Sequence, residues 1–297
     1  MTGVGLAGGA AAPLSLDAWR AAGDFFEWRG HRIFFRAEGD GAPLLLMHGF
    51  PTASWDWARV WAPLIAAGHR VLALDMIGYG LSAKPHPFDY SILAFADLYE
   101  AFSMRQRVDR VRVLAHDVGN TVAQELLARH RGGALGFRIE RVCLLNGGLF
   151  PETHRARVTQ KLLASRLGPL LASRTTYARF AASMRGVCTR PIADDELRGM
   201  WRLVEESDGR RVMPSLIGYI AERRANRARW VGALVSSDVP VRLIDGVDDP
   251  ISGGHMVARY RELVPRADVV ELRGVGHYPQ VEAADEVLAA AVPFFAA

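Results

Sequence analysis

The chain has 297 residues, half of them hydrophobic, and a formal net charge of +4. It is long and apolar enough to bury a full core, and it suits one large domain that carries an insertion. The basic residues are almost all arginines interleaved with acids, so we expect no nucleic-acid partner. Two cysteines, Cys143 and Cys188, cannot form a disulfide framework, which favours a reducing compartment and a cytoplasmic protein.

The first thirteen residues are small and mostly apolar, but they lack a basic n-region and are too short and too rich in glycine to span a bilayer. We expect residues 1–24 to be a flexible lead, with a cleaved leader as the alternative. No other stretch is a candidate span, so we expect no membrane partner.

Short apolar and β-branched runs alternate with helical patterns along the chain. Such alternation predicts an α/β fold with a mostly parallel central sheet and helices on both of its faces. We expect the first run to be an antiparallel edge. The predicted strands are Ile33 to Ala37, Leu44 to Met47, Arg70 to Leu74, Val111 to Ala115, Val142 to Leu145, Val241 to Ile244 and Val269 to Leu272.

The alternation is interrupted once, between Gly148 and about Gly232, by a helical and arginine-rich stretch. We therefore expect a core at 25–148 and 232–297 and an inserted helical cap at 149–231. A cap over the carboxyl ends of the strands would form a pocket there. The densest basic run in it has helical spacing and predicts a solvated helix face, with members Arg223, Arg224, Arg227 and Arg229.

The segment at 113–120 predicts a strand that turns sharply into a helix. In a nucleophile elbow the middle residue projects from a strained turn between small neighbours, and the next backbone N–H helps to form an oxyanion hole. Here Asp117 holds the nucleophile position, Ala115 replaces the usual first glycine, and Gly119 is kept. Taken alone, the same aspartate could equally cap the following helix.

Two loops further along the chain favour the elbow. Asp249 follows one predicted strand in a G-x-x-D-P pattern, and His277 follows the last one. Nucleophile, acid and base then come in the order found in α/β-hydrolases, each directly after a strand. We expect His277 to be the base and Asp249 to fix its tautomer, with Asp248 facing solvent.

A fourth motif, H-G-F-P, directly follows the predicted strand at 44–47. Gly49 permits a turn that no larger residue could make, and the Phe50–Pro51 bond is a candidate cis peptide. We expect the backbone N–H groups of Phe50 and Val118 to form the oxyanion hole.

The motifs H-G-F-P, A-H-D-V-G, G-x-x-D-P and G-x-G-H-Y-P-Q resemble the epoxide hydrolase and haloalkane dehalogenase branch of the α/β-hydrolases, over nearly everything after about Phe26. The segments at 145–154 and 229–234 are similar to the mesoderm-specific transcript protein and its bacterial relatives. The resemblance implies the family's catalytic roles for Asp117, Asp249 and His277, which hold the matching motif positions. It does not supply the substrate.

A carboxylate nucleophile suits displacement at a strained or activated saturated carbon, and it leaves an ester on the protein. The family's epoxide hydrolases protonate the departing alkoxide with cap tyrosines, for which Tyr219 is the better candidate and Tyr177 the weaker one. The family's dehalogenases usually hold the halide with a tryptophan directly after the nucleophile, where this chain has Val118, and many of its epoxide hydrolases also carry tryptophan there.

The leading hypothesis is therefore cofactor-independent hydrolysis of a small, apolar, electrophilic epoxide to a diol. Haloalkane dehalogenation and a catalytically silent, ligand-binding role are the alternatives. We expect Phe50, Trp201 and Tyr278 to contact the substrate. No cluster of His, Cys or carboxylate residues has the spacing of metal ligands, so we expect no metal. A homodimer is left open.

Overall fold

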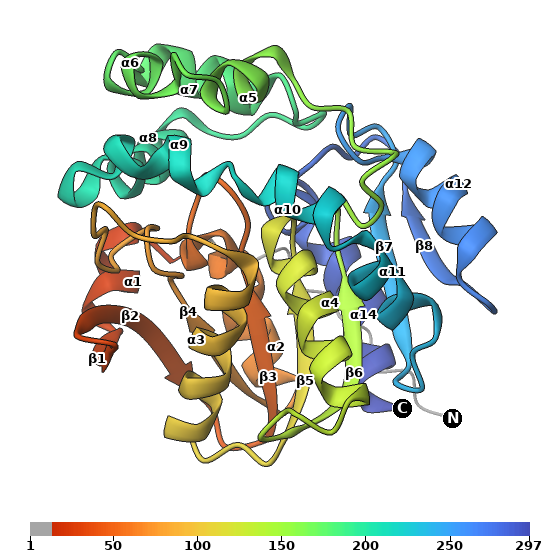
Figure 1. Cartoon of the computed structure of the whole chain (residues 1–297). Coiled ribbons are helices and arrows are strands. Elements are labelled where there is room, and N and C mark those ends of the chain that lie inside the picture. The colour runs from red at the N-terminus through yellow and green to blue at the C-terminus, as the bar shows by residue number, and fades with distance from the viewer. Residues whose placement is uncertain (1–13) are drawn as a thin grey trace.

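The computed structural model describes residues 14–297, and its centre is an eight-stranded sheet in the order β1-β2-β4-β3-β5-β6-β7-β8 (Figure 1). β2 pairs antiparallel with β1 and with β4, and all later pairs are parallel. The predicted α/β-hydrolase fold is thereby confirmed. The strands are β1 (Asp24–Trp28), β2 (His31–Glu38), β3 (Ala42–Met47), β4 (His69–Leu74), β5 (Arg110–Ala115), β6 (Arg138–Leu144), β7 (Val241–Gly246) and β8 (Asp268–Leu272).

The central strands are apolar on both faces, which is why helices must cover both. In β3, Leu45 and Met47 join a core with α3, α4 and α12, whereas Leu44 and Leu46 join a second core with α1, α2 and α14. Burying each such side chain contributes roughly 2 kcal/mol. The core helices are α1 (Leu16–Ala21), α2 (Ala58–Ala66), α3 (Ile92–Arg105), α4 (Val118–Arg131), α12 (Gly254–Leu263), α13 (Pro279–Glu282) and α14 (Ala284–Ala296), with a 3₁₀ turn η1 (Ser54–Trp57).

Two expectations about the N-terminal part need correction. The strand predicted at 33–37 is antiparallel, but β1 pairs with its outer side and is the edge of the sheet. Within the stretch predicted as a flexible lead, 1–24, residues 16–21 instead form α1, and the Trp19 ring is buried against Trp61. Residues 1–13 lie outside the described residues.

Between β6 and β7 the chain forms helices without a strand, as the sequence predicted. The helices α5 to α10 lie in a layer above the sheet and are here called the cap, whereas α11 packs against α4 (Figure 1). The limits predicted for the cap, 149 and 231, stay a prediction. No helix within residues 14–297 is long and apolar enough to cross a membrane. The elements are α5 (Val158–Leu163), α6 (Gly168–Ser173), α7 (Tyr177–Arg185), α8 (Asp194–Glu205), η2 (Glu206–Val212), α9 (Met213–Leu216), α10 (Tyr219–Ala225) and α11 (Arg227–Val235).

Candidate active site

Asp117 lies on the sharp turn that joins β5 to α4. Its backbone has φ 46° and ψ −107°, a conformation that a non-glycine residue adopts only when the surrounding structure enforces it. Its side chain is buried and makes no capping hydrogen bond to α4. The geometry is therefore that of a nucleophile elbow, and the alternative of a helix cap is not realised.

Glycines make this turn sterically feasible. A Cβ on Gly119 would lie 2.3 Å from the carbonyl oxygen of Met47, and a Cβ on Gly49 would lie 2.6 Å from Cβ of Asp117. Real atoms do not approach so closely. The start of α4 can therefore pack on the end of β3, and the loop after β3 can pack on Asp117, only because both residues are glycines. The glycines of the H-G-F-P and A-H-D-V-G motifs are therefore required by this close packing.

The Asp117 carboxylate accepts a backbone hydrogen bond from the loop after β3. The Phe50 N–H donates to Asp117 Oδ2 at 3.1 Å, and the Phe50–Pro51 bond is cis, as predicted. Val118 is the first residue of α4, where a backbone N–H has no helical carbonyl to reach. The Phe50 N–H thus contacts the carboxylate, whereas the role of the Val118 N–H as the second oxyanion-hole donor stays a prediction.

His277 lies in the loop after β8, and its Nδ1 is 2.7 Å from Asp249 Oδ2. Burial alone would lower the pKa of His277, but the charge and hydrogen bond of Asp249, with the charge of Asp117, outweigh burial and raise it. Burial alone would raise the pKa of Asp249, and the same His277 contact holds it well below its usual range. The pair can therefore accept a proton on the imidazole while Asp249 stays ionised.

Asp249 also accepts hydrogen bonds from Asn146 and Ser252. No role in the site was predicted for Asn146 from the sequence. Asn146 Nδ2 donates to Asp249 Oδ2 at 3.1 Å and to the Gly246 carbonyl at 2.9 Å, and its Oδ1 accepts from the Gly246 N–H at 2.7 Å. Ser252 Oγ donates to the same carboxylate at 2.7 Å. By contrast, Asp248 is exposed, as expected.

Arg223 is the site residue that the sequence interpretation placed wrongly. Its side chain is only 2 % exposed, and Nη2 donates to the Asp117 carbonyl at 3.0 Å and to Asp117 Oδ1 at 3.3 Å. Its Nε donates to Thr121 at 2.7 Å, and its guanidinium lies 4.5 Å from the centre of the Tyr219 ring. Helix α10 turns this face toward the nucleophile, so Arg223 does not belong to the predicted solvated face, whereas its neighbour Arg224 is exposed.

Arg223 sets the charge state of the candidate nucleophile. Burial alone would raise the pKa of Asp117, but Arg223, followed by His277 and His116, brings it below its ordinary value. The carboxylate is thus kept ionised in a buried position, as a nucleophile requires. An arginine four residues after a cap tyrosine, on one helix face, was the available signal in the sequence.

The two candidate tyrosines have different surroundings. Tyr219 is buried, its ring centroid is 6.1 Å from that of Phe50, and its hydroxyl has no hydrogen-bond partner among the described residues. Tyr177 lies at the start of α7, and its hydroxyl donates to Asp194 near the surface. The structure therefore places Tyr219 beside Phe50 and Arg223, which both contact the nucleophile, and leaves Tyr177 outside the cavity.

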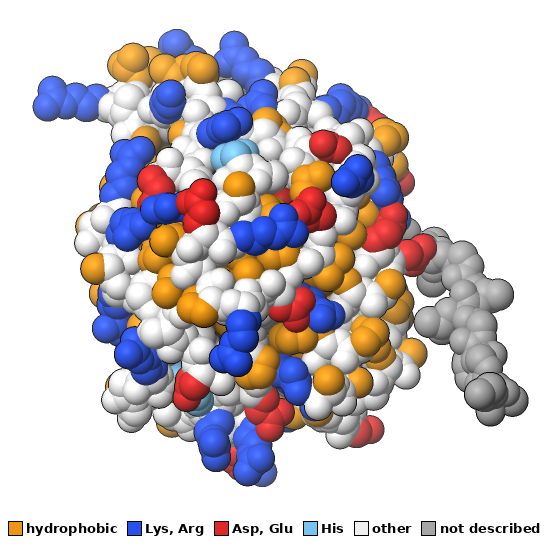
Figure 2. Space-filling view, turned by 90° about the vertical axis from the view of Figure 1, so that its right-hand side faces the viewer, with side chains coloured by type: hydrophobic (Ala, Val, Ile, Leu, Met, Phe, Trp, Pro, Cys, Tyr) orange, Lys and Arg blue, Asp and Glu red, His pale blue; other side chains and the backbone are white. Residues whose placement is uncertain are grey.

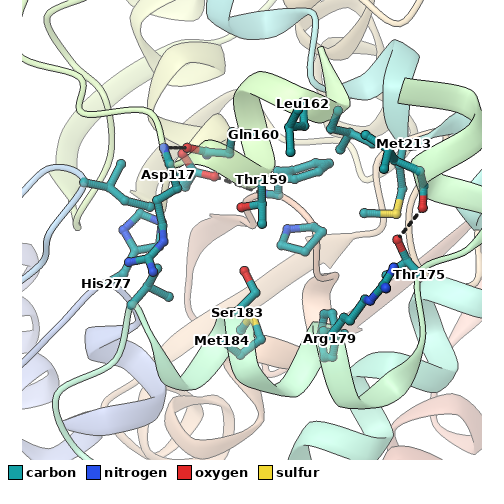
Figure 3. A pocket seen from close by; sticks show the side chains of 18 of the residues that line it. Asp117, Thr159, Gln160, Leu162, Thr175, Arg179, Ser183, Met184, Met213 and His277 are labelled. Atoms are coloured by element: carbon teal, nitrogen blue, oxygen red, sulfur yellow. Dashed lines mark hydrogen bonds between the residues drawn. The ribbon is translucent and has the colours of Figure 1, made fainter. Parts of the chain in front are cut away.

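A cavity of about 290 Å³ lies between the strand ends and the cap. Asp117 and His277 lie together at one end of it, and Thr175, Arg179 and Met213 of the cap line the other (Figure 3). Much of the wall is apolar, formed by Leu162, Leu163, Leu171, Phe180, Met184 and Met213.

Of the residues expected to contact substrate, Phe50 and Tyr278 line this cavity. Trp201 does not: it is buried within the cap, where its ring packs against that of Phe180 with the ring centroids 5.3 Å apart. Tyr219 is also absent from the lining, although its neighbour Phe50 forms part of it.

Known proteins resemble this chain along most of its length. The family model described as alpha/beta hydrolase fold matches residues 42–284. The mesoderm-specific transcript homolog protein of Bos taurus is 40% identical over 282 residues, covering 90% of this chain and 84% of the relative. The putative hydrolase LipZ of Mycobacterium tuberculosis is 38% identical over 272 residues, covering 91% and 94%. The solved structure of the epoxide hydrolase CorEH superimposes with a TM-score of 0.77 at 18% identity, covering 92% of this chain and 98% of that one.

Proposed function

Because the chain belongs to the alpha/beta hydrolase fold family, we propose that this hydrolase opens an apolar epoxide to a diol through a covalent ester on Asp117. The observation that carries the proposal is the position of Arg223. One guanidinium contacts both the candidate nucleophile, at 3.3 Å from Asp117 Oδ1, and the candidate proton donor, at 4.5 Å from the Tyr219 ring centre.

In the first step Asp117 Oδ1 attacks a ring carbon of the epoxide. The carbon–oxygen bond breaks, and its electron pair goes to the ring oxygen, which takes the hydroxyl proton of Tyr219. Oδ2 stays on the Phe50 N–H and becomes the carbonyl oxygen of the ester. The negative charge has then moved from Asp117 to Tyr219, and both positions lie beside Arg223.

The surroundings of Tyr219 favour release of its hydroxyl proton while the ester on Asp117 forms. Burial raises the pKa of Tyr219, the charge of Asp117 raises it further, and Arg223 lowers it. Ester formation removes the charge of Asp117, so Tyr219 becomes a stronger acid as the alkoxide develops. Arg223 retains a counter-charge throughout, which matters because an unpaired buried cation is costly.

In the second step His277 takes a proton from a water molecule, and the hydroxide adds to the carboxyl carbon of Asp117. The N–H groups of Phe50 and Val118 stabilise the oxyanion. Collapse releases the alkoxide, which takes the proton from His277, and the new carboxylic acid returns its proton to Tyr219. One diol oxygen thus comes from Asp117, and the oxygen of water stays on the enzyme.

Dehalogenation has less support in this cavity. A departing halide needs N–H donors such as indoles, and no tryptophan is among the described residues that line the cavity. Trp230, from α11, donates its indole N–H to Glu125 at 2.9 Å.

The oxygen pathway gives a direct test of the proposal. With enzyme in excess over an aryl epoxide in ¹⁸O-labelled water, the first turnover should give unlabelled diol and one ¹⁸O in the peptide containing Asp117. Label in the diol with an unlabelled Asp117 would instead show direct attack by water, and no diol from a broad epoxide panel would rule out the reaction.

The proton donor is tested separately. Tyr219→Phe should slow ester formation by about 100-fold or more, because general acid catalysis contributes on that scale, and should leave the fold intact. Tyr177→Phe is the matched control and should keep the rate of the parent protein. Equal rates for the two variants would remove Tyr219 from the mechanism.

A further inference from the structure

The cap carries an unusual distribution of charge. Residues 153–193 contain no Asp or Glu, and they contain eight basic residues. Since the whole chain has a net charge of +4, the remaining residues carry −4. The basic residues of this stretch are Arg155, Arg157, Lys161, Arg166, Arg174, Arg179, Arg185 and Arg190.

Most of these cations have no carboxylate beside them. Arg185 pairs with Asp194 and Arg190 pairs with Glu286. Among residues 14–297, the salt bridges include none from the other six, of which five are exposed: Arg155, Lys161, Arg166, Arg174 and Arg179. Unpaired cations at a surface favour an anionic partner.

Large aliphatic side chains are exposed on the same part of the cap. Val158 and Leu162 of α5 are 69% and 43% exposed, and Leu167 and Leu170, at and near the start of α6, are 59% and 47% exposed. Blue basic and orange hydrophobic side chains lie next to one another along the top of the molecule (Figure 2). Short segments that mix Leu and Val with Lys and Arg are typical of surfaces that lie in a membrane interface.

This surface, here called the cap outer face (residues 155–179), is continuous with the cavity. Leu162 is both exposed and part of the cavity wall, and Arg157 and Arg179 also line the cavity. An apolar molecule that entered between these residues would therefore reach the end where Asp117 and His277 lie.

We propose that the cap outer face docks on an anionic phospholipid bilayer, so that apolar substrates pass from the lipid directly into the cavity. Each basic residue near such a surface strengthens binding, and the exposed aliphatic side chains can insert among the acyl chains. A second copy of the chain fits this surface poorly, because a twofold contact would bring the same unpaired cations together. We expected no membrane partner because the sequence offers no spanning segment, but docking on a bilayer surface does not require one.

Flotation with lipid vesicles tests this proposal without any assay of the reaction. The protein should float with vesicles of phosphatidylcholine containing 30% phosphatidylglycerol, and not with phosphatidylcholine alone, and binding should weaken as salt rises. The triple variant Lys161→Glu, Arg166→Glu, Arg174→Glu should partition about 100-fold more weakly. Leu167→Ser with Leu170→Ser should weaken partitioning about tenfold or more.

Matched controls separate the cap outer face from general charge and folding. Arg131→Glu with Arg138→Glu reverses two exposed cations away from the cap and should bind vesicles like the parent protein. Circular dichroism should show that every variant remains folded. Equal binding to neutral and anionic vesicles, unchanged binding by the triple variant, or loss of a stable dimer in that variant without any effect on flotation would overturn the proposal.

Discussion

At the candidate nucleophile, a buried carboxylate depends on a buried cation from a different element. Asp117 belongs to the elbow after β5, and Arg223 comes from α10 of the cap. The charges of His277 and His116 also lower the pKa of Asp117, whereas burial lowers the pKa of His154, in the loop after β6, to about 4. At neutral pH Arg223 is therefore the permanent positive charge at Asp117.

Arg223→Met should move the acid limb of Asp117 alkylation to higher pH. Arg223 depresses the pKa of Asp117, so without it the carboxylate takes up a proton at a higher pH and stops attacking. The stability that the pair contributes above the unfolded-state pKa should fall as well. The pH dependence of single-turnover ester formation measures the effect.

Arg223→Lys should lie between the parent protein and Arg223→Met, because it keeps the charge and loses the planar contact. Arg224→Met alters the exposed neighbour and should leave the pH profile unchanged. An unchanged profile in Arg223→Met would mean that Arg223 only packs against the site.

Asn146 joins the ends of β6 and β7 through three buried hydrogen bonds, one of them to Asp249. Asn146→Ala should lower the free energy of unfolding by about 2–4 kcal/mol, because it leaves buried polar groups without partners. Urea unfolding measures this. Asn226→Ala, which removes a partly buried bond to the Glu222 carbonyl, should cost less than about 1 kcal/mol, and equal costs would contradict the role given to Asn146.

Asp117, Asp249 and His277 could be found from the sequence because each directly follows a strand, and parallel strands bring their carboxyl ends to one edge. Arg223 could not be found in this way. Helical spacing shows which residues share a face, but it does not show which face of α10 meets the core. The same limit explains Tyr177 and Trp201, which lie in the cap but outside the cavity.

At the scale of elements, the close approach of β3, β5 and α4 defines the elbow. Gly119→Ala should destabilise the protein by about 1–3 kcal/mol, because its Cβ would meet the Met47 carbonyl at 2.3 Å. Gly232→Ala is a helical control in α11 whose added Cβ meets nothing within 4 Å. It should stabilise by up to about 1 kcal/mol.

Thermal or urea unfolding of the two alanine variants measures the difference. Similar effects at both positions would show that α4 can shift away from β3 without cost, and would contradict the close packing of Gly119 against Met47.

The strands could be predicted to the extent that their side chains are apolar. Those of the central sheet are buried on both faces and were recognised from their sequence. The edge strand β1 was missed because only Phe26 and Trp28 in it are buried, whereas Asp24 and Glu27 are exposed. An edge strand is specified by its pairing with β2 as much as by its own residues.

For the whole molecule, the alternation of strands and helices along the chain, its single helical interruption and the order of the motifs were sufficient to predict the fold. The size of the cavity and the residues in its wall follow from how the cap packs on the sheet, which periodicity does not specify. The acid-free stretch at 153–193 can be found in the sequence, but its position in the cap, next to the cavity, cannot.

The most direct test of the central claim is mass spectrometry of the His277→Ala protein after incubation with an aryl epoxide and, separately, with a bromoalkane. Without the base, the ester should form and persist. We expect an adduct of the epoxide on Asp117 and none from the bromoalkane. An adduct from the bromoalkane alone would indicate a dehalogenase, and the absence of any adduct on Asp117 would contradict the covalent mechanism.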